Sequence, residues 1–170
     1  MNRRHARFFS QYPGVAQLVA RVVWDHEAAG SNPVTRTTYL KKYGAVMTME
    51  DWIAYCLSKP GAYIDHPFGT DSTILKVEKR IFAQFFQLHG QEMCTLNCDA
   101  ASGQFYRQAY PDIVVRGWHC PSVQQPYFNT FPLNGSLTDA VISEMIDLSY
   151  RTVVGKLPKY VQKQLNHSEA

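Results

Sequence analysis

The chain has 170 residues, of which 45% are hydrophobic and 18% charged, and its formal net charge is +3. This composition is typical of one globular domain with a hydrophobic core and excludes a disordered chain. No segment approaches the ~18 uncharged apolar residues of a membrane span. The four cysteines are too few for a disulfide framework in a chain of this length. We therefore expect a cytoplasmic protein without a membrane partner.

The basic charge is concentrated in the first 46 residues. Residues 1–46 contain seven Lys and Arg against two acids, a net charge of +5, whereas residues 47–170 contain ten against twelve, a net charge of −2. A secretory signal is disfavoured because Gln17, Arg21 and Asp25 interrupt the apolar stretch. A mitochondrial-type presequence fits the Arg-rich composition better, although the acids and a Pro-Gly pair would break its helix. A basic arm that binds DNA is a third interpretation.

A fourth interpretation of this leader arises on reverse translation. Gly30-Ser31-Asn32-Pro33 can be encoded by GGT-TCG-AAT-CC, a string typical of the T-arm of a tRNA gene. The upstream segment GVAQLVAR can be encoded by a D-arm-like string at about the correct distance. We therefore hypothesise that residues 1–46 are the conceptual translation of a tRNA gene and that the true start is Met47, in preference to Met1 or Met49. A nucleotide sequence that cannot be folded into a cloverleaf would refute this.

The first half of the remaining 47–170 domain combines a helix with a hairpin. Thr48 and Asp51 have the spacing of a capping box and predict a helix over residues 49–59 that stops at Pro60-Gly61. The segment after it, AYIDHPFGTDS, is rich in Pro, Gly and Asp and predicts a loop. The β-rich runs TILKVEK and RIFAQFFQLH meet at Glu78-Lys79-Arg80 and predict a hairpin. The segment EMCTLNCD predicts a third strand.

The second half of the domain is predicted to contain a short helix, two strands and two further helices. Residues 101–110 predict a short helix that ends before Pro111, and DIVVR and YFNTFPL predict strands on either side of a loop. Ser136 and Asp139 predict the start of a long helix over residues 140–157, and Pro158 opens a last helix. Hairpins without regular strand–helix alternation favour an α+β, two-layer domain, in which helices pack on one face of an antiparallel sheet of about five strands.

The long helix carries an apolar stripe that should face the sheet. The stripe consists of Val141, Ile142, Met145, Leu148 and Val153.

Six segments of this domain carry a family resemblance. They are HPFG (66–69), ILKVEKRIFAQF (74–85), LNCD (96–99), YRQAYPDI (106–113), YFNTFPLNGSL (127–137) and LSYRTVVGKLPK (148–159). In this order and spacing, over about residues 47–163, the chain resembles the MmcQ/YjbR family of small bacterial proteins. The resemblance implies a two-layer α+β fold similar to that of type III secretion chaperones, and it implies DNA binding.

The chain departs from the family pattern at one place. Where many members carry a basic residue followed by His and Trp, it has Gln125, Pro126, Tyr127 and Phe128. The loss of that basic residue argues against a phosphate contact at this point.

The cysteines suggest no metal or catalytic site. Cys94, Cys98, His119 and Cys120 could supply soft ligands to zinc, but residues four apart in a strand lie about 13 Å apart and cannot share one ion. Buried thiols that act as small hydrophobes are the better interpretation. A nucleophilic pair of Cys120 with His89 has no identified orienting partner, and common nucleotide-binding and hydrolase motifs are absent. We expect a binding protein without catalytic residues, metal or cofactor.

The candidate DNA-binding residues are the cations of the domain. They are Lys76, Lys79 and Arg80 at the hairpin, Arg107 on the middle helix, Arg116 beside Trp118, and Lys156, Lys159 and Lys163 near the C-terminus. Phosphate binding requires several of them on one face, and the C-terminal lysines could flank the hairpin if the last helices pack beside it. A helix end whose cations complement its dipole is the competing interpretation, above all for Lys156.

Two aromatic residues near Arg116 leave alternatives open. Trp118 and Tyr127 could stack on bases or fill the core. With a net charge of −2 on the domain, DNA binding should be weak and strongly salt-dependent.

A protein-interaction adaptor or chaperone-like module is the alternative hypothesis. Exposed sheet edges and a 13% content of aromatic residues suit a protein partner whose segment adds as a strand or docks in a groove.

Overall fold

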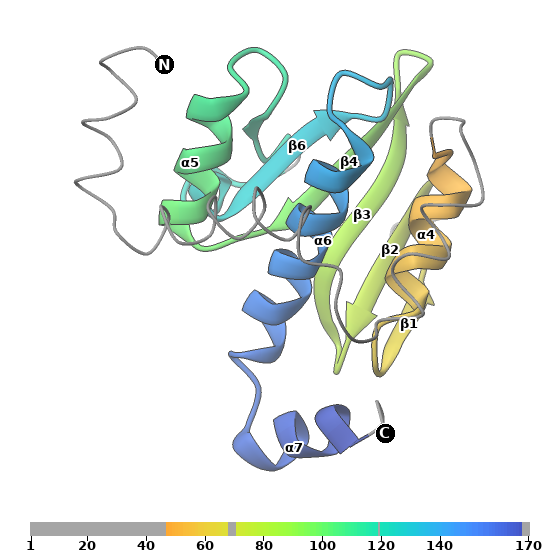
Figure 1. The fold of residues 1–170 in the computed structure, drawn as a ribbon, viewed down its shortest axis with the longest axis vertical. Helices are drawn as coiled ribbons and strands as arrows, with labels where there is room; N and C mark the ends of the chain where they lie inside the picture. The colour runs from red at the N-terminus through yellow and green to blue at the C-terminus, as the bar shows by residue number, and fades with distance from the viewer. Residues whose placement is uncertain (1–46, 68–70, 119, 168–170) are drawn as a thin grey trace, which may run out of the picture. The chain divides into compact units, whose positions relative to one another are not determined.

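A six-stranded antiparallel sheet with helices on one face forms the domain in the computed structural model, which describes residues 47–67, 71–118 and 120–167 (Figure 1). The strands are β1 (Ala62–Asp65), β2 (Ser72–Val77), β3 (Arg80–Leu88), β4 (Gln91–Asn97), β5 (Val115–Arg116) and β6 (Phe128–Pro132). The helices are α4 (Met49–Leu57), α5 (Ala100–Ala109), the 3-10 turn η1 (Gln125–Tyr127), α6 (Asp139–Val154) and α7 (Lys159–His167). The predicted leader, residues 1–46, lies outside the described residues.

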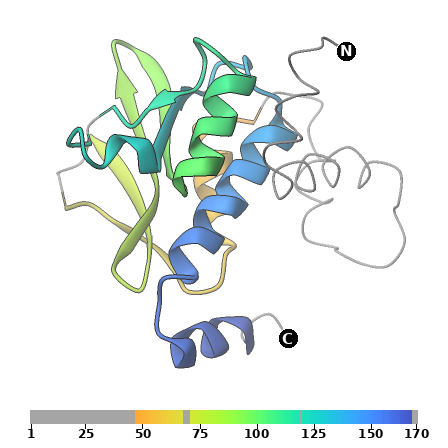
Figure 2. The same ribbon diagram turned by 90° about the vertical axis from the view of Figure 1, so that its left-hand side faces the viewer.

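The strand order β1-β2-β3-β4-β6-β5 confirms the α+β class. α4 contacts the β1 side of the sheet, α6 crosses β3 and β4, and α5 contacts β5 and β6. Figure 2 shows α5 and α6 next to each other on the same face. No helix in the described part of the chain is long and apolar enough to cross a bilayer.

Two local signals hold in the structure. At the start of α4, Thr48 Oγ1 accepts a hydrogen bond from the Asp51 amide at 3.3 Å, while the Thr48 amide donates to Asp51 Oδ2 at 3.0 Å. The β2–β3 hairpin turns at Glu78 and Lys79, both with positive φ, 47° and 65°. Two consecutive left-handed residues match the twist of the flanking strands. The capping box and the hairpin are therefore confirmed.

The expected loop over residues 62–72 is wrong in its first part. Residues Ala62–Asp65 form β1, which pairs with β2 from Ala62↔Val77 to Asp65↔Ile74. An edge strand needs hydrogen bonds on one side only, so a short segment with little apolar patterning still pairs once the hairpin is present to receive it. The sheet therefore has six strands where about five were expected.

Two further boundaries differ from the prediction. Thr138, not Ser136, caps α6: its side chain accepts from the Val141 amide at 3.4 Å. The Ser136 amide and hydroxyl instead donate to Asn134 Oδ1, at 3.0 and 2.6 Å, in a turn that precedes the helix. The predicted strand 112–116 shortens to β5 because the Val114 amide donates to the Tyr110 carbonyl, at 3.0 Å, in a turn that closes α5.

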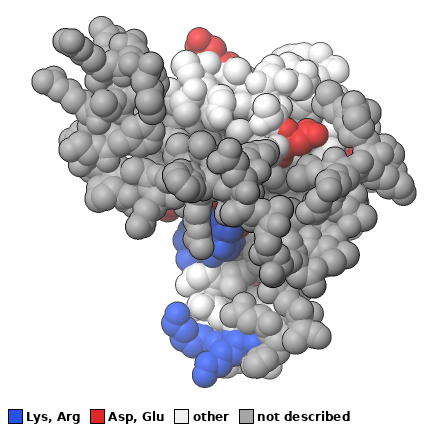
Figure 3. Space-filling model, in the orientation of Figure 1, with Lys and Arg blue, Asp and Glu red and all other residues white. Residues whose placement is uncertain are grey.

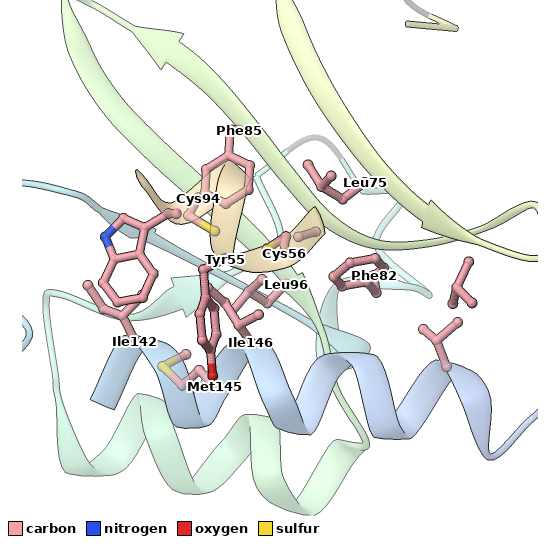
Figure 4. Packing of buried hydrophobic residues seen from close by; sticks show 14 of the residues in the cluster. Tyr55, Cys56, Leu75, Phe82, Phe85, Cys94, Leu96, Ile142, Met145 and Ile146 are labelled. Atoms are coloured by element: carbon pink, nitrogen blue, oxygen red, sulfur yellow. The ribbon is translucent and has the colours of Figure 1, made fainter. Parts of the chain in front are cut away.

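The core lies between the sheet and the helices α4 and α6. Figure 4 shows Ile142, Met145 and Ile146 of α6 pointing toward the sheet beside Tyr55 and Cys56 of α4. The predicted α6 stripe is buried at Ile142, Met145 and Val153 and partly buried at Val141 and Leu148. Burial of these side chains supplies the main stabilising term of the fold.

Helix α7 packs against the beginning of β1. Gly61 has φ +65°, and a Cβ at this position would lie 2.6 Å from Leu165 Cδ2 and 3.7 Å from Val77 Cγ2. Val161 and Leu165 of α7 are buried, as is Leu157 before it. The glycine therefore permits α7 to lie against the end of the β1–β2 pair.

We expect Gly61→Ala to lower the free energy of unfolding by about 1 kcal/mol more than Gly90→Ala. Both positions have positive φ, but nothing lies within 4 Å of a Cβ at Gly90. The loss of stability in Gly90→Ala therefore measures backbone strain alone. The additional loss in Gly61→Ala measures the cost of displacing Leu165. Urea unfolding of both variants tests this, and equal losses would show that α7 does not depend on the Gly61 contact.

Candidate nucleic-acid interface

Strand register places several loops at one end of the sheet. Ala83 lies opposite Leu96, Asn97 opposite Phe128, and Arg116 opposite Asn129. The turn before β3, the end of β4, the start of β6 and the end of β5 are therefore neighbours along this end. The β3–β4 turn lies at the opposite end (Figure 1).

The hairpin contributes two exposed cations to this end. Lys79 occupies the second left-handed position of the turn, and Arg80 begins β3. Both side chains are exposed. None of the ion pairs found among the described residues involves them. Their charges are available to an anionic ligand.

Helix α7 and the segment just before it carry three more cations. Leu165 packs near Val77, the residue directly before the turn at Glu78. Lys156, Lys159 and Lys163 are exposed around this helix, and Lys159 Nζ lies 3.5 Å from Gln162 Oε1. The face drawn in Figure 3 shows Lys and Arg side chains over the lower part of the domain, where α7 lies. Leu165 therefore brings the C-terminal part of α7 near the residue that precedes the hairpin turn.

We call these cations the basic end; its members are Lys79, Arg80, Lys156, Lys159 and Lys163. Acids at the same end of the sheet include Glu78 in the turn and Asp99 after β4. Partial burial acts to raise the pKa of Asp99, but hydrogen bonds from Ser102 outweigh it and the pKa is lowered. The five cations of the basic end outnumber these two acids.

Two of the predicted DNA-binding residues instead form contacts within the fold. Lys76 forms an ion pair with Asp65 across β1 and β2 at 2.5 Å, and its side chain is only 15% exposed. Its hydrogen bond lowers the pKa of the exposed Asp65 carboxyl. Arg107 Nη1 donates to Asn129 Oδ1 at 2.5 Å, which ties α5 to β6. Burial lowers the pKa of Arg107, and the nearby charge of Arg116 acts in the same direction.

Arg116 lies beside exposed aromatic rings. Trp118 is 52% exposed and Tyr127 is 47% exposed, so neither ring fills the core. Arg116 itself is exposed at the end of β5. The interpretation of these rings as core residues is therefore wrong.

Sequence reasoning missed Tyr160, which is 67% exposed on α7 next to Lys159. Its helical neighbours Val161 and Leu165 are buried. The period of this helix could have indicated that Tyr160 points outward.

The cysteines are free thiols in the structure. Cys56, Cys94 and Cys98 are buried, and burial raises the pKa of Cys98 to about 12. Cys120 is partly exposed, and its pKa is also raised by desolvation. Protonated, desolvated thiols are poor nucleophiles. Among the residues that the structure describes, which do not include His119, no three His, Cys, Asp or Glu residues are grouped closely enough to hold a metal ion.

The chain is similar in sequence to two known Escherichia coli proteins. It is 29% identical over 121 residues to the Escherichia coli K12 protein named "Uncharacterized protein YjbR", which covers 70% of this chain and 98% of the relative. The Escherichia coli O157:H7 protein of the same name matches equally.

Two crystal structures share the fold. A Deinococcus radiodurans protein described as a DUF419 domain matches with a TM-score of 0.64 and 24% identity over 71% of this chain and 89% of that protein. A Pseudomonas syringae protein matches with a TM-score of 0.52 and 17% identity over 62% of this chain and 98% of that protein.

The family model YjbR matches residues 57–152. These residues run from the end of α4 to the last turn of α6 and contain the whole sheet. The chain belongs to the YjbR family.

Proposed function

We propose that this protein binds DNA weakly and without sequence preference, through the phosphates, at the basic end. It acts as a binding protein, without catalysis, in the cytoplasm. The free state of all four cysteines supports a reducing compartment.

The observation that carries this proposal is the packing of α7 beside the β2–β3 hairpin. The hairpin carries two exposed cations, and α7 with the segment just before it carries three. Together they offer five exposed cations, Lys79, Arg80, Lys156, Lys159 and Lys163. Each phosphate that such a cation neutralises releases condensed counterions, which is the main source of non-specific affinity.

Fluorescence anisotropy of the full chain with a labelled random-sequence duplex tests the proposal. We expect binding at about 50 mM salt and a linear fall of log Kobs with log salt, since five contacts give a slope near −4.5 and a roughly 500-fold loss by 200 mM. A basic segment in residues 1–46 could only steepen this slope. No binding at 50 mM salt, or binding that salt does not weaken, would refute the proposal.

A protein-interaction role is the second candidate, and the edge strand β1 favours it. Tyr63 and Ile64 are exposed hydrophobic residues on this strand, which pairs with β2 on one side. A partner segment could add to its other side. Ile64→Lys should then abolish the protein complex without changing the affinity for DNA, because a charge on an edge strand opposes strand addition.

A further inference from the structure

The aromatic residues beside Arg116 lie on the same end of the sheet as the basic end. Trp118 is the second residue after β5, and Tyr127 directly precedes β6. We use the name aromatic step for the surface formed by Arg116, Trp118 and Tyr127. Both rings are about half exposed, at 52% and 47%. Each ring therefore has surface that a ligand can reach.

The backbone of the aromatic step is held in place by hydrogen bonds. The Trp118 amide donates to Thr130 Oγ1 at 3.0 Å, and the Gly117 amide donates to the Phe128 carbonyl at 3.0 Å. The Tyr127 carbonyl accepts from the Cys98 amide at 2.9 Å. The backbone that carries both rings is therefore held in place, which lowers the backbone entropy lost on binding.

The aromatic step and the basic end are separated by a short distance across the sheet. The strand order β3-β4-β6-β5 puts three strand spacings between the start of β3 at Arg80 and the end of β5 at Arg116. At ~4.8 Å per spacing this is roughly 14 Å across the strands, and the register places Arg116 level with Ala83, about 10 Å along β3 from Arg80. The two residues are therefore about 17 Å apart. One extended strand of nucleic acid that crosses this end of the sheet could reach both surfaces.

We propose that the ligand of the basic end is single-stranded DNA, with its phosphates on the cations and its bases stacked on Trp118 and Tyr127. This inference rests on the DNA binding proposed above. A duplex keeps its base faces inside its own stack, whereas a single strand exposes them to aromatic side chains. Stacking is tolerant of sequence because every base has a π-face. A duplex would therefore offer the rings of Trp118 and Tyr127 no base face on which to stack.

Three labelled probes of equal length test this with the full chain: a 15-nucleotide dT strand, an abasic 15-mer with the same phosphates, and a 15-bp duplex. We expect the dT strand to bind about tenfold tighter than the abasic strand for each stacked base. Equal affinity for the dT and abasic strands would overturn the inference.

Variants of Trp118 assign the effect to the ring. Trp118→Leu keeps an apolar side chain and should reduce affinity for dT about tenfold without changing affinity for the abasic strand, while Trp118→Phe should restore most of the loss. Val123→Ala is the matched control, because Val123 is 78% exposed on the same loop and has no ring. An equal loss on dT and abasic strands would indicate a structural role and contradict stacking.

The probes also separate the two proposals. If the abasic strand and the duplex bind as tightly as dT, DNA binding stands and the single-strand inference fails. If none of the probes binds at about 50 mM salt, the proposed function itself fails.

Discussion

Replacing Phe82 with alanine is expected to lower the free energy of unfolding by about 3–5 kcal/mol. Phe82 is fully buried, and its ring packs edge-to-face on Tyr150 of α6, with ring centroids 5.6 Å apart. Its carbonyl accepts a hydrogen bond from Ser149 of α6. It also lies at the shift in register between β2 and β3, where Leu75 pairs with Ala83 and Lys76 with Ile81. The truncation would leave a cavity where α6 meets the sheet.

Urea unfolding followed by circular dichroism measures this loss. A domain of ordinary stability, about 5–15 kcal/mol, would lose a large part of it. Val123→Ala is the control, because this exposed side chain should change stability by no more than about 0.5 kcal/mol. A loss below 1 kcal/mol for Phe82→Ala would show that the sheet–α6 contact is not the centre of the core.

Neutralising the basic end is expected to remove most of the salt dependence of DNA binding. A five-site variant with glutamine at Lys79, Arg80, Lys156, Lys159 and Lys163 should make the slope of log Kobs against log salt shallower by about 4.5. These side chains are exposed, so the fold should tolerate the changes. Any slope that remains would come from cations elsewhere in the chain, including residues 1–46.

A matched pair of variants separates a local contact from net charge. Lys79→Gln/Arg80→Gln and Gln91→Glu/Gln108→Glu each lower the net charge by two. Gln91 begins β4 at the opposite end of the sheet, and Gln108 is exposed near the end of α5. The first pair should make the slope shallower by about 1.8, and the second should leave it unchanged. Equal effects would show that binding follows total charge and not the basic end.

The sequence predicts those parts of the fold whose signals are local. The capping box joins Thr48 and Asp51 within one turn, and the hairpin depends on residues 78–80 between two β-rich runs. The cap of α6 was misplaced because Ser136 and Thr138 both offer hydroxyls before the helix, and Asn134 engages the first of them. Local chemistry therefore indicates that a helix begins, but competition between neighbouring side chains decides the exact residue.

The parts that sequence reasoning missed depend on distant partners. β1 forms because β2 offers it a free edge. Lys76 looks like a free hairpin cation until Asp65 of β1 comes within ion-pair distance, and Arg107 looks free until β6 brings Asn129 beside α5. Helix α7 lies near the residue before the hairpin turn because Gly61 leaves room for Leu165. Which cations remain available for a ligand is thus a property of tertiary packing.

Mapping backbone amide chemical shifts of the full chain during titration with DNA tests the central claim most directly. We predict that the shifts concentrate at Lys79 and Arg80 and in α7, and that the β3–β4 turn at Gly90 stays unchanged as an internal reference. Shifts confined to the β3–β4 turn, shifts confined to residues 1–46, or no shifts at about 50 mM salt would contradict the assignment of the basic end as the DNA-binding surface.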